Sequence, residues 1–117
     1  MTREEFKART KSYSLRVIKL VEALPRDAVS KTLGHQLLRS GTSVAANYRA
    51  SVRAKSTADF IAKMGIVEEE CDESLFWMEL LIESGRIKPG RVTDLMREGG
   101  ELLAITVASI KTARRGK

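Results

Sequence analysis

Residues 56–85 read STADFIAKMGIVEEECDESLFWMELLIESG, and this stretch decides the fold. It opens with Ser56-x-x-Asp59, which resembles a capping box, and closes with Ser84-Gly85, a pair typical of a helix end. Between these ends, apolar side chains recur every three or four residues, as they do along one face of a helix. The stripe consists of Phe60, Met64, Val67, Cys71, Leu75, Met78 and Ile82. The segment is therefore predicted to be a long helix that buries this stripe in a core.

The same helix carries a second face on the opposite arc, which mixes apolar and acidic side chains. This face consists of Ala62, Ile66, Glu69, Glu73, Phe76, Trp77 and Leu80. A helix that is apolar on two sides is usually central, and no helix of a four-helix monomer is central. We therefore expect the second face to pack against another copy of the chain, with Phe76 and Trp77 as anchors. The alternative is that the two rings tuck under a loop at the end of the bundle.

Three further helices flank this segment. Thr2-x-x-Glu5 is a capping box, Asp27 is a suitable N-cap, and Pro89 suits the first turn of a last helix. We expect helices at about residues 2–24, 27–54, 56–84 and 88–113, and no segment shows the period-two alternation of strands. Short turns between long helices predict an all-α, antiparallel up-down four-helix bundle, as one domain over residues 1–117. Gly99-Gly100 inside the last helix indicates either a kink or a close helix crossing.

Composition narrows the class of protein. The chain has 117 residues, one cysteine and one histidine, so an internal disulfide framework and a multi-histidine metal site are excluded. The longest runs without a charge are nine residues, whereas a membrane-spanning helix needs about 20 apolar residues. The first residues lack the apolar stretch of a secretory signal. These features favour a cytoplasmic protein that does not associate with membranes.

The few residues with catalytic potential do not form a recognisable motif. His35 has Thr32, and not a glutamate, three residues before it, so the Glu-x-x-His motif of di-iron bundles is absent. Cys71 lies on the core stripe and His35 on an outward stripe, so the two are not expected to meet. No glycine-rich phosphate loop occurs. We therefore expect no enzyme activity, no metal and no cofactor.

Charge is segregated along the chain, whose formal net charge is +6. Residues 1–56 have a net charge of +8, residues 57–84 of −7, and residues 85–117 of +5. On the second helix the small residues Ser43, Ala46 and Ala50 lie beside a basic stripe, which consists of Lys31, His35, Arg39, Arg49 and Arg53. These arginines could bind the acidic face of a neighbouring subunit, or phosphates, or simply be solvated.

Two functional hypotheses follow from this charge. The first is an oligomeric accessory protein that binds RNA or DNA backbones, and the second is a protein-interaction scaffold that uses its charge only for assembly. In the first, Arg3, Lys7, Arg9 and Lys11 on the first helix add to the basic surface. The candidate nucleic-acid-binding residues are Arg39, Arg49, Arg53, Lys111, Arg114 and Arg115. The interface candidates are the second face of the third helix together with Ser43, Ala46 and Ala50.

Three stretches resemble a known family, the 23S rRNA-intervening sequence proteins. They are residues 38–48 (LRSGTSVAANY), residues 56–60 (STADF) and residues 69–81 (EECDESLFWMELL). The family usually has Glu-Gly or Glu-Ala three residues after the asparagine, where this chain has Ala50 and Ser51. The resemblance implies a short antiparallel four-helix bundle that assembles as a ring, commonly a homopentamer. A distant relative is the accessory protein of diversity-generating retroelements, which implies nucleic acid and a reverse transcriptase as partners.

Overall fold

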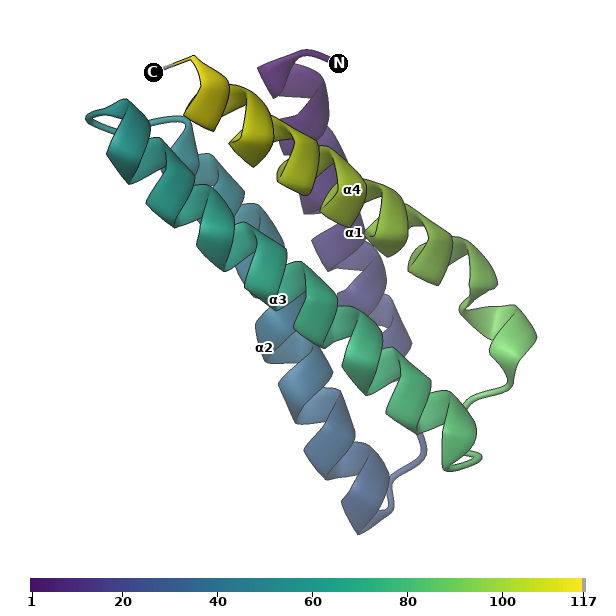
Figure 1. The fold of residues 1–117 in the computed structure, drawn as a ribbon. Helices are drawn as coiled ribbons and strands as arrows, with labels where there is room; N and C mark the ends of the chain where they lie inside the picture. Colours follow the sequence, from purple (N-terminus) through teal and green to yellow (C-terminus); the bar gives the residue numbers. More distant parts are fainter. Residues whose placement is uncertain (117) are drawn as a thin grey trace.

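The fold is all-α, as predicted. The computed structural model describes residues 1–116, which form a body of 48 × 22 × 21 Å. It contains α1 (Arg3–Glu22), α2 (Ala28–Ser51), α3 (Thr57–Glu83), a 3-10 turn η1 (Pro89–Arg91) and α4 (Thr93–Arg115), and no strand in this range. Both termini and the α2–α3 turn lie at one end of the bundle, and the other two connections lie at the opposite end (Figure 1).

The first three helices begin at the predicted caps. The Thr2 hydroxyl accepts a hydrogen bond from the Glu5 amide while the Glu5 carboxylate accepts one from the Thr2 amide, which completes the capping box. The Asp27 carboxylate accepts from the Ser30 amide at 2.9 Å, and this bond lowers the pKa of Asp27. The Ser56 hydroxyl accepts from the Asp59 amide at 3.1 Å. Each cap satisfies an amide that the helix itself leaves without an acceptor.

The last helix begins five residues later than the expected residue 88, whereas its end lies within two residues of the expected residue 113. Pro89 begins the separate turn η1, and α4 runs from Thr93 to Arg115. Val92 separates the two elements because its backbone is at φ −121° and its side chain is 1% exposed, packed into the core. α3 ends at Glu83, and Gly85 follows it at φ +80°, which allows the Arg86 amide to donate to the Leu81 carbonyl in a Schellman-type cap.

The core is built on the predicted stripe of α3. Met64, Val67, Cys71 and Met78 are essentially fully buried. Beside them the Tyr13 hydroxyl of α1 lies 2.7 Å from Ser74 Oγ, which itself donates to the Cys71 carbonyl. Tyr13 is therefore the donor to Ser74, and its burial raises the pKa of the phenol well above the usual range.

Glycines allow two close helix crossings. A Cβ added at Gly99 of α4 would lie 2.8 Å from Leu75 Cδ2 and 2.9 Å from the Tyr13 hydroxyl. A Cβ at Gly41 of α2 would lie 2.8 Å from Val17 Cγ1 of α1. No real Cβ contact is that short, so both positions require glycine for close approach. Of the two alternatives for Gly99, the structure shows the close crossing.

Candidate functional site

The second face of α3 lies on the molecular surface with large apolar side chains exposed. Phe76 is 46% exposed and Ile66 is 43% exposed. Ala62 and Glu69 are also exposed, whereas Glu73 and Leu80 are half-buried. Exposed apolar residues that share one helix face are typical of a contact with another protein. Part of this face is therefore exposed in the single chain, and its contact with another copy stays a prediction.

Trp77 differs from the rest of this face because it packs against the core. Its ring is half-buried and meets Phe76 edge to face, with 5.1 Å between ring centroids. The indole nitrogen Nε1 is buried and finds no hydrogen-bond acceptor within residues 1–116. Leaving such a donor without an acceptor costs about 1–3 kcal/mol. Phe76 is thus the exposed ring of the pair, and Trp77 is the ring that packs against the core.

Arg39 of α2 pairs with acidic residues of its own chain. Its guanidinium donates to Glu70 and to Glu73 of α3, both at 2.9 Å. Because α2 and α3 pack side by side, the basic stripe of α2 lies next to the second face of α3. Arg39 therefore bridges α2 and α3, although half of its side chain is exposed.

The small residues of α2 differ in exposure, although their spacing places them on one side of the helix. Ser43 and Ala50 are half-buried, and the Ser43 hydroxyl donates to the Arg39 carbonyl. Ala46 is exposed and lines a shallow groove of about 190 Å³ between α1 and α2. Arg49 and the α1 residues Lys7 and Lys11 line the same groove. The basic stripe therefore splits, with Arg39 turned to α3 and Arg49 turned to α1.

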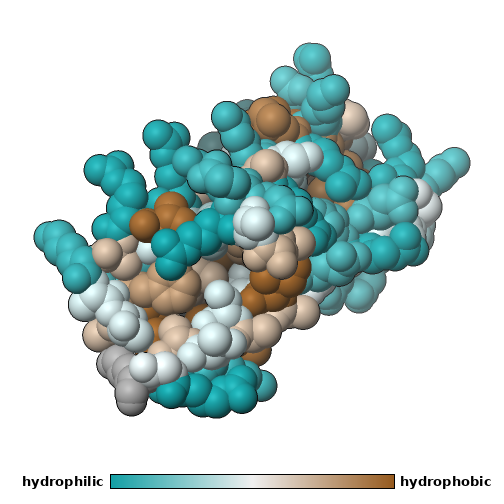
Figure 2. All heavy atoms as spheres, turned by 90° about the horizontal axis from the view of Figure 1, so that it is seen from above, coloured by the Kyte–Doolittle hydropathy of each residue, from teal (hydrophilic) through white to brown (hydrophobic). Residues whose placement is uncertain are grey.

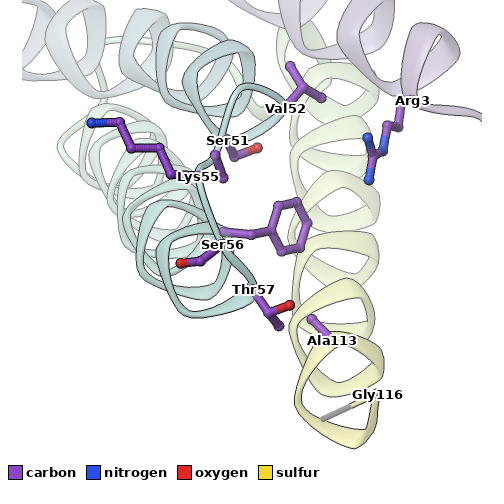
Figure 3. A pocket seen from close by; sticks show the side chains of 10 residues that line it. Arg3, Ser51, Val52, Lys55, Ser56, Thr57, Ala113 and Gly116 are labelled. Atoms are coloured by element: carbon purple, nitrogen blue, oxygen red, sulfur yellow. The ribbon is translucent and has the colours of Figure 1, made fainter.

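The end of the bundle that carries the termini is basic. Arg53, Lys111, Arg114 and Arg115 are exposed there or close to it, and Lys117 lies outside the described residues. Seen from this end, polar side chains surround patches of apolar surface (Figure 2). A cleft of about 440 Å³ opens between the α2–α3 turn and the end of α4. Arg3 and Lys55 lie at its edges in Figure 3.

One predicted contributor to the basic surface is neutralised within the chain. Arg9 of α1 donates from Nε to Glu98 of α4 at 2.9 Å, makes a second bond to the same carboxylate, and also pairs with Glu101. This pairing lowers the pKa of Glu98 and raises that of Arg9. The expectation that Arg9 adds free positive charge is wrong, because α4 brings two carboxylates to it.

Cys71 and His35, the two side chains with catalytic potential, do not lie together. Cys71 is fully buried, which raises the pKa of its thiol to about 12, and its Sγ donates to the Gly99 carbonyl at 3.3 Å. His35 is exposed on α2. Within the described part of the chain, no cluster of three or more His, Cys, Asp or Glu side chains could hold a metal ion. None of the helices in that part has the length and apolarity needed to cross a membrane.

These observations define a small, basic, all-α protein whose surface offers an apolar-acidic face and several free cations. The chain belongs to the 23S rRNA-intervening sequence protein family, whose model matches residues 4–108. It is also similar to a protein of unknown function from the S23 ribosomal protein family of Bacteroides thetaiotaomicron, known from its crystal structure. The two chains are 31% identical with a TM-score of 0.88, over 95% of this chain and 99% of the other. No curated protein matches the chain. The family resemblance seen in the sequence is confirmed.

Proposed function

We propose that this protein is a non-enzymatic, cytoplasmic accessory protein that assembles into a ring of antiparallel up-down bundles and binds nucleic-acid backbones. The positions of the helix connections support the antiparallel order, because each turn lies at the end opposite to the one before it (Figure 1). The family's name links it with an intervening sequence of 23S rRNA. RNA is therefore the first ligand to test.

The observation that carries the binding proposal is the set of exposed cations without acidic partners. Arg49, Arg53, Lys111, Arg114 and Arg115 are all exposed, and none forms an ion pair within residues 1–116. Phosphate backbones bind such cations because counterions condensed on the nucleic acid are released. Five copies of the chain would carry a formal charge of +30 on one particle, which strengthens this attraction.

The observation that supports assembly is the exposed apolar surface of α3. Ile66 and Phe76 point away from their own bundle, and acidic Glu69 lies beside them. A contact between unlike faces closes into a ring when the rotation between subunits allows it. Assembly through α3 would cover much of the acidic segment, so the assembled particle would present mainly its basic surfaces.

The binding proposal is tested by titrating the protein into a labelled, mixed-sequence RNA of about 20 nucleotides. We expect dissociation constants of about 1–100 µM near physiological salt, tighter binding at 50 mM salt, and a linear fall of log affinity with log salt. The double variant Arg114→Gln/Arg115→Gln should bind more weakly with unchanged oligomer mass. Absence of binding at 50 mM salt by the intact oligomer would contradict the proposal.

The second candidate is a protein-interaction scaffold, which the exposure of Ile66 and Phe76 favours. Under this alternative, the positive charge serves solubility and assembly alone. The same RNA titration separates the two candidates, because a scaffold of this kind would leave the RNA unbound at every salt concentration.

A further inference from the structure

The groove between α1 and α2 combines three cations with a floor of small side chains. Lys7 and Lys11 come from α1, and Ala45, Ala46 and Arg49 come from α2. We call this site the α1–α2 groove. Its volume is about 190 Å³, and its only side-chain hydrogen-bonding groups are the two ammonium groups and the guanidinium.

The position of these cations follows from how the two helices pack. Lys7 and Lys11 are four residues apart, so their side chains lie one above the other on the same face of α1. Gly41 lets α1 approach closely, and Ser14 of α1 donates a hydrogen bond to the Gly41 carbonyl at 2.8 Å. This contact holds the two helices in register, so Arg49 is placed across the groove from the lysines.

Within residues 1–116, the three cations lack acidic partners. None of Lys7, Lys11 and Arg49 forms an ion pair within the described range, residues 1–116. Glu4 shares a face of α1 with Lys7 and Lys11 by its spacing, but within residues 1–116 it forms no ion pair with either lysine. Like charges gathered around one groove repel each other, so an anionic occupant would relieve the repulsion.

We propose that the α1–α2 groove binds the phosphodiester backbone of a nucleic acid, a proposal that rests on the function given above. The guanidinium of Arg49 suits bidentate bonds to phosphate oxygens, and the lysines act as point charges on neighbouring phosphates. The alanine floor offers no aromatic ring for base stacking and no side-chain acceptor or donor for base edges. Binding in the groove is therefore independent of sequence.

This assignment separates the arginines of α2 by role. Arg39 holds α2 against α3 through Glu70 and Glu73. Arg49 is a phosphate ligand, and Ala46 is part of the groove floor. Replacement of Ala46 by glutamate would place a carboxylate in the groove without removing any cation, and it should repel the ligand.

The test compares two triple variants that remove equal charge. In the groove variant, Lys7, Lys11 and Arg49 are replaced by glutamine. The control variant replaces three exposed cations of other surfaces, Lys19, Lys31 and Arg91, which form no ion pairs in the part of the chain that the structure describes. The probe is a labelled single-stranded RNA of about 20 mixed nucleotides, titrated between 50 and 300 mM salt. Circular dichroism and light scattering establish that all proteins keep the wild-type fold and mass.

We expect the groove variant to lose about tenfold or more in RNA affinity at 50 mM salt. Its slope of log affinity against log salt should be smaller by about 2, because each single-strand phosphate contact contributes about 0.7. The control should lose markedly less affinity and keep its slope within about 0.5 of the wild type. Ala46→Glu should also weaken binding. If the groove variant fails to fold, this single substitution still tests the groove.

Three outcomes would overturn the assignment. If wild type binds RNA but the groove and control variants lose the same affinity and slope, the groove is not the phosphate site, while the proposed function stands. If the groove variant loses binding to a polyglutamate peptide and not to RNA, the groove binds acidic protein segments instead. If wild type binds no RNA at 50 mM salt, the proposed function and this proposal both fail.

Discussion

Gly99 and Gly100 are neighbours in α4 whose replacement by alanine should have opposite effects on stability. A Cβ at Gly99 would lie 2.8 Å from Leu75 Cδ2 and 2.9 Å from the Tyr13 hydroxyl, whereas one at Gly100 would meet nothing within 4 Å. Both substitutions gain about 1 kcal/mol of helix propensity. At position 100 this gain should appear undiminished, because the new methyl group points to solvent.

At position 99 the gain is outweighed by overpacking. The Tyr13 ring is fully buried and its hydroxyl is held by Ser74, so it cannot move away freely. Forcing an extra methyl group into such a core typically costs about 1–3 kcal/mol, and displacement of α4 would also lengthen the bond from Cys71 Sγ to the Gly99 carbonyl. We therefore expect Gly99→Ala to destabilise the fold by up to about 2 kcal/mol net.

The assay is urea unfolding followed by circular dichroism at one fixed protein concentration, since assembly adds to apparent stability. Gly100→Ala should raise the midpoint and Gly99→Ala should lower it, with equal slopes for both. Equal stabilisation by the two substitutions would refute the close crossing of α4 with α1 and α3.

Three further predictions concern charge, the thiol and assembly. Arg9 lowers the pKa of Glu98 below its ordinary 4.5, so this pair stabilises the fold above that pH and its contribution is lost as pH falls through the lowered pKa. Glu98→Gln should therefore cost about 1 kcal/mol at pH 7 in urea unfolding, and the cost should shrink below pH 4.5; a cost independent of pH would argue against the pair. Cys71, with its thiol pKa raised to about 12, should react with a disulfide reagent at pH 8 about a hundredfold more slowly in native than in urea-unfolded protein, and equal rates would place the thiol outside the core. Phe76→Ser should lower the particle mass in light scattering, whereas Leu15→Ser, at an apolar position of α1 that is at least as exposed, should leave it unchanged; the opposite pattern would move the interface to α1.

The sequence was sufficient to predict the helices and the core because both depend on local patterns. Ser56 and Asp27 cap helices through bonds to amides only three residues away, which do not depend on tertiary packing. The spacing of Met64, Cys71 and Met78 places them on one face of any helix. The start of α4 was not predictable in this way. Proline is compatible with the first turn of either helix type, and the burial of Val92 that separates η1 from α4 depends on tertiary packing.

The candidate site was predicted less completely, because charge pairing depends on how each helix is rotated against its neighbours. Arg39 and Arg49 share the outward stripe of α2, but only the packing shows that one turns to the carboxylates of α3 and the other to the lysines of α1. Arg9 likewise meets Glu98 across 89 positions of sequence. No spacing rule within one helix contains this information.

The central proposal, an oligomer that binds nucleic-acid backbones, is tested most directly by sedimentation of a labelled 20-nucleotide RNA with the wild-type protein. At 50 mM salt we predict that the RNA co-sediments with a particle whose protein mass is a multiple of the 13.0 kDa chain, and that about 300 mM salt releases the RNA while the protein stays assembled. RNA that sediments alone at 50 mM salt, or protein that sediments as a 13.0 kDa monomer, would contradict the proposal.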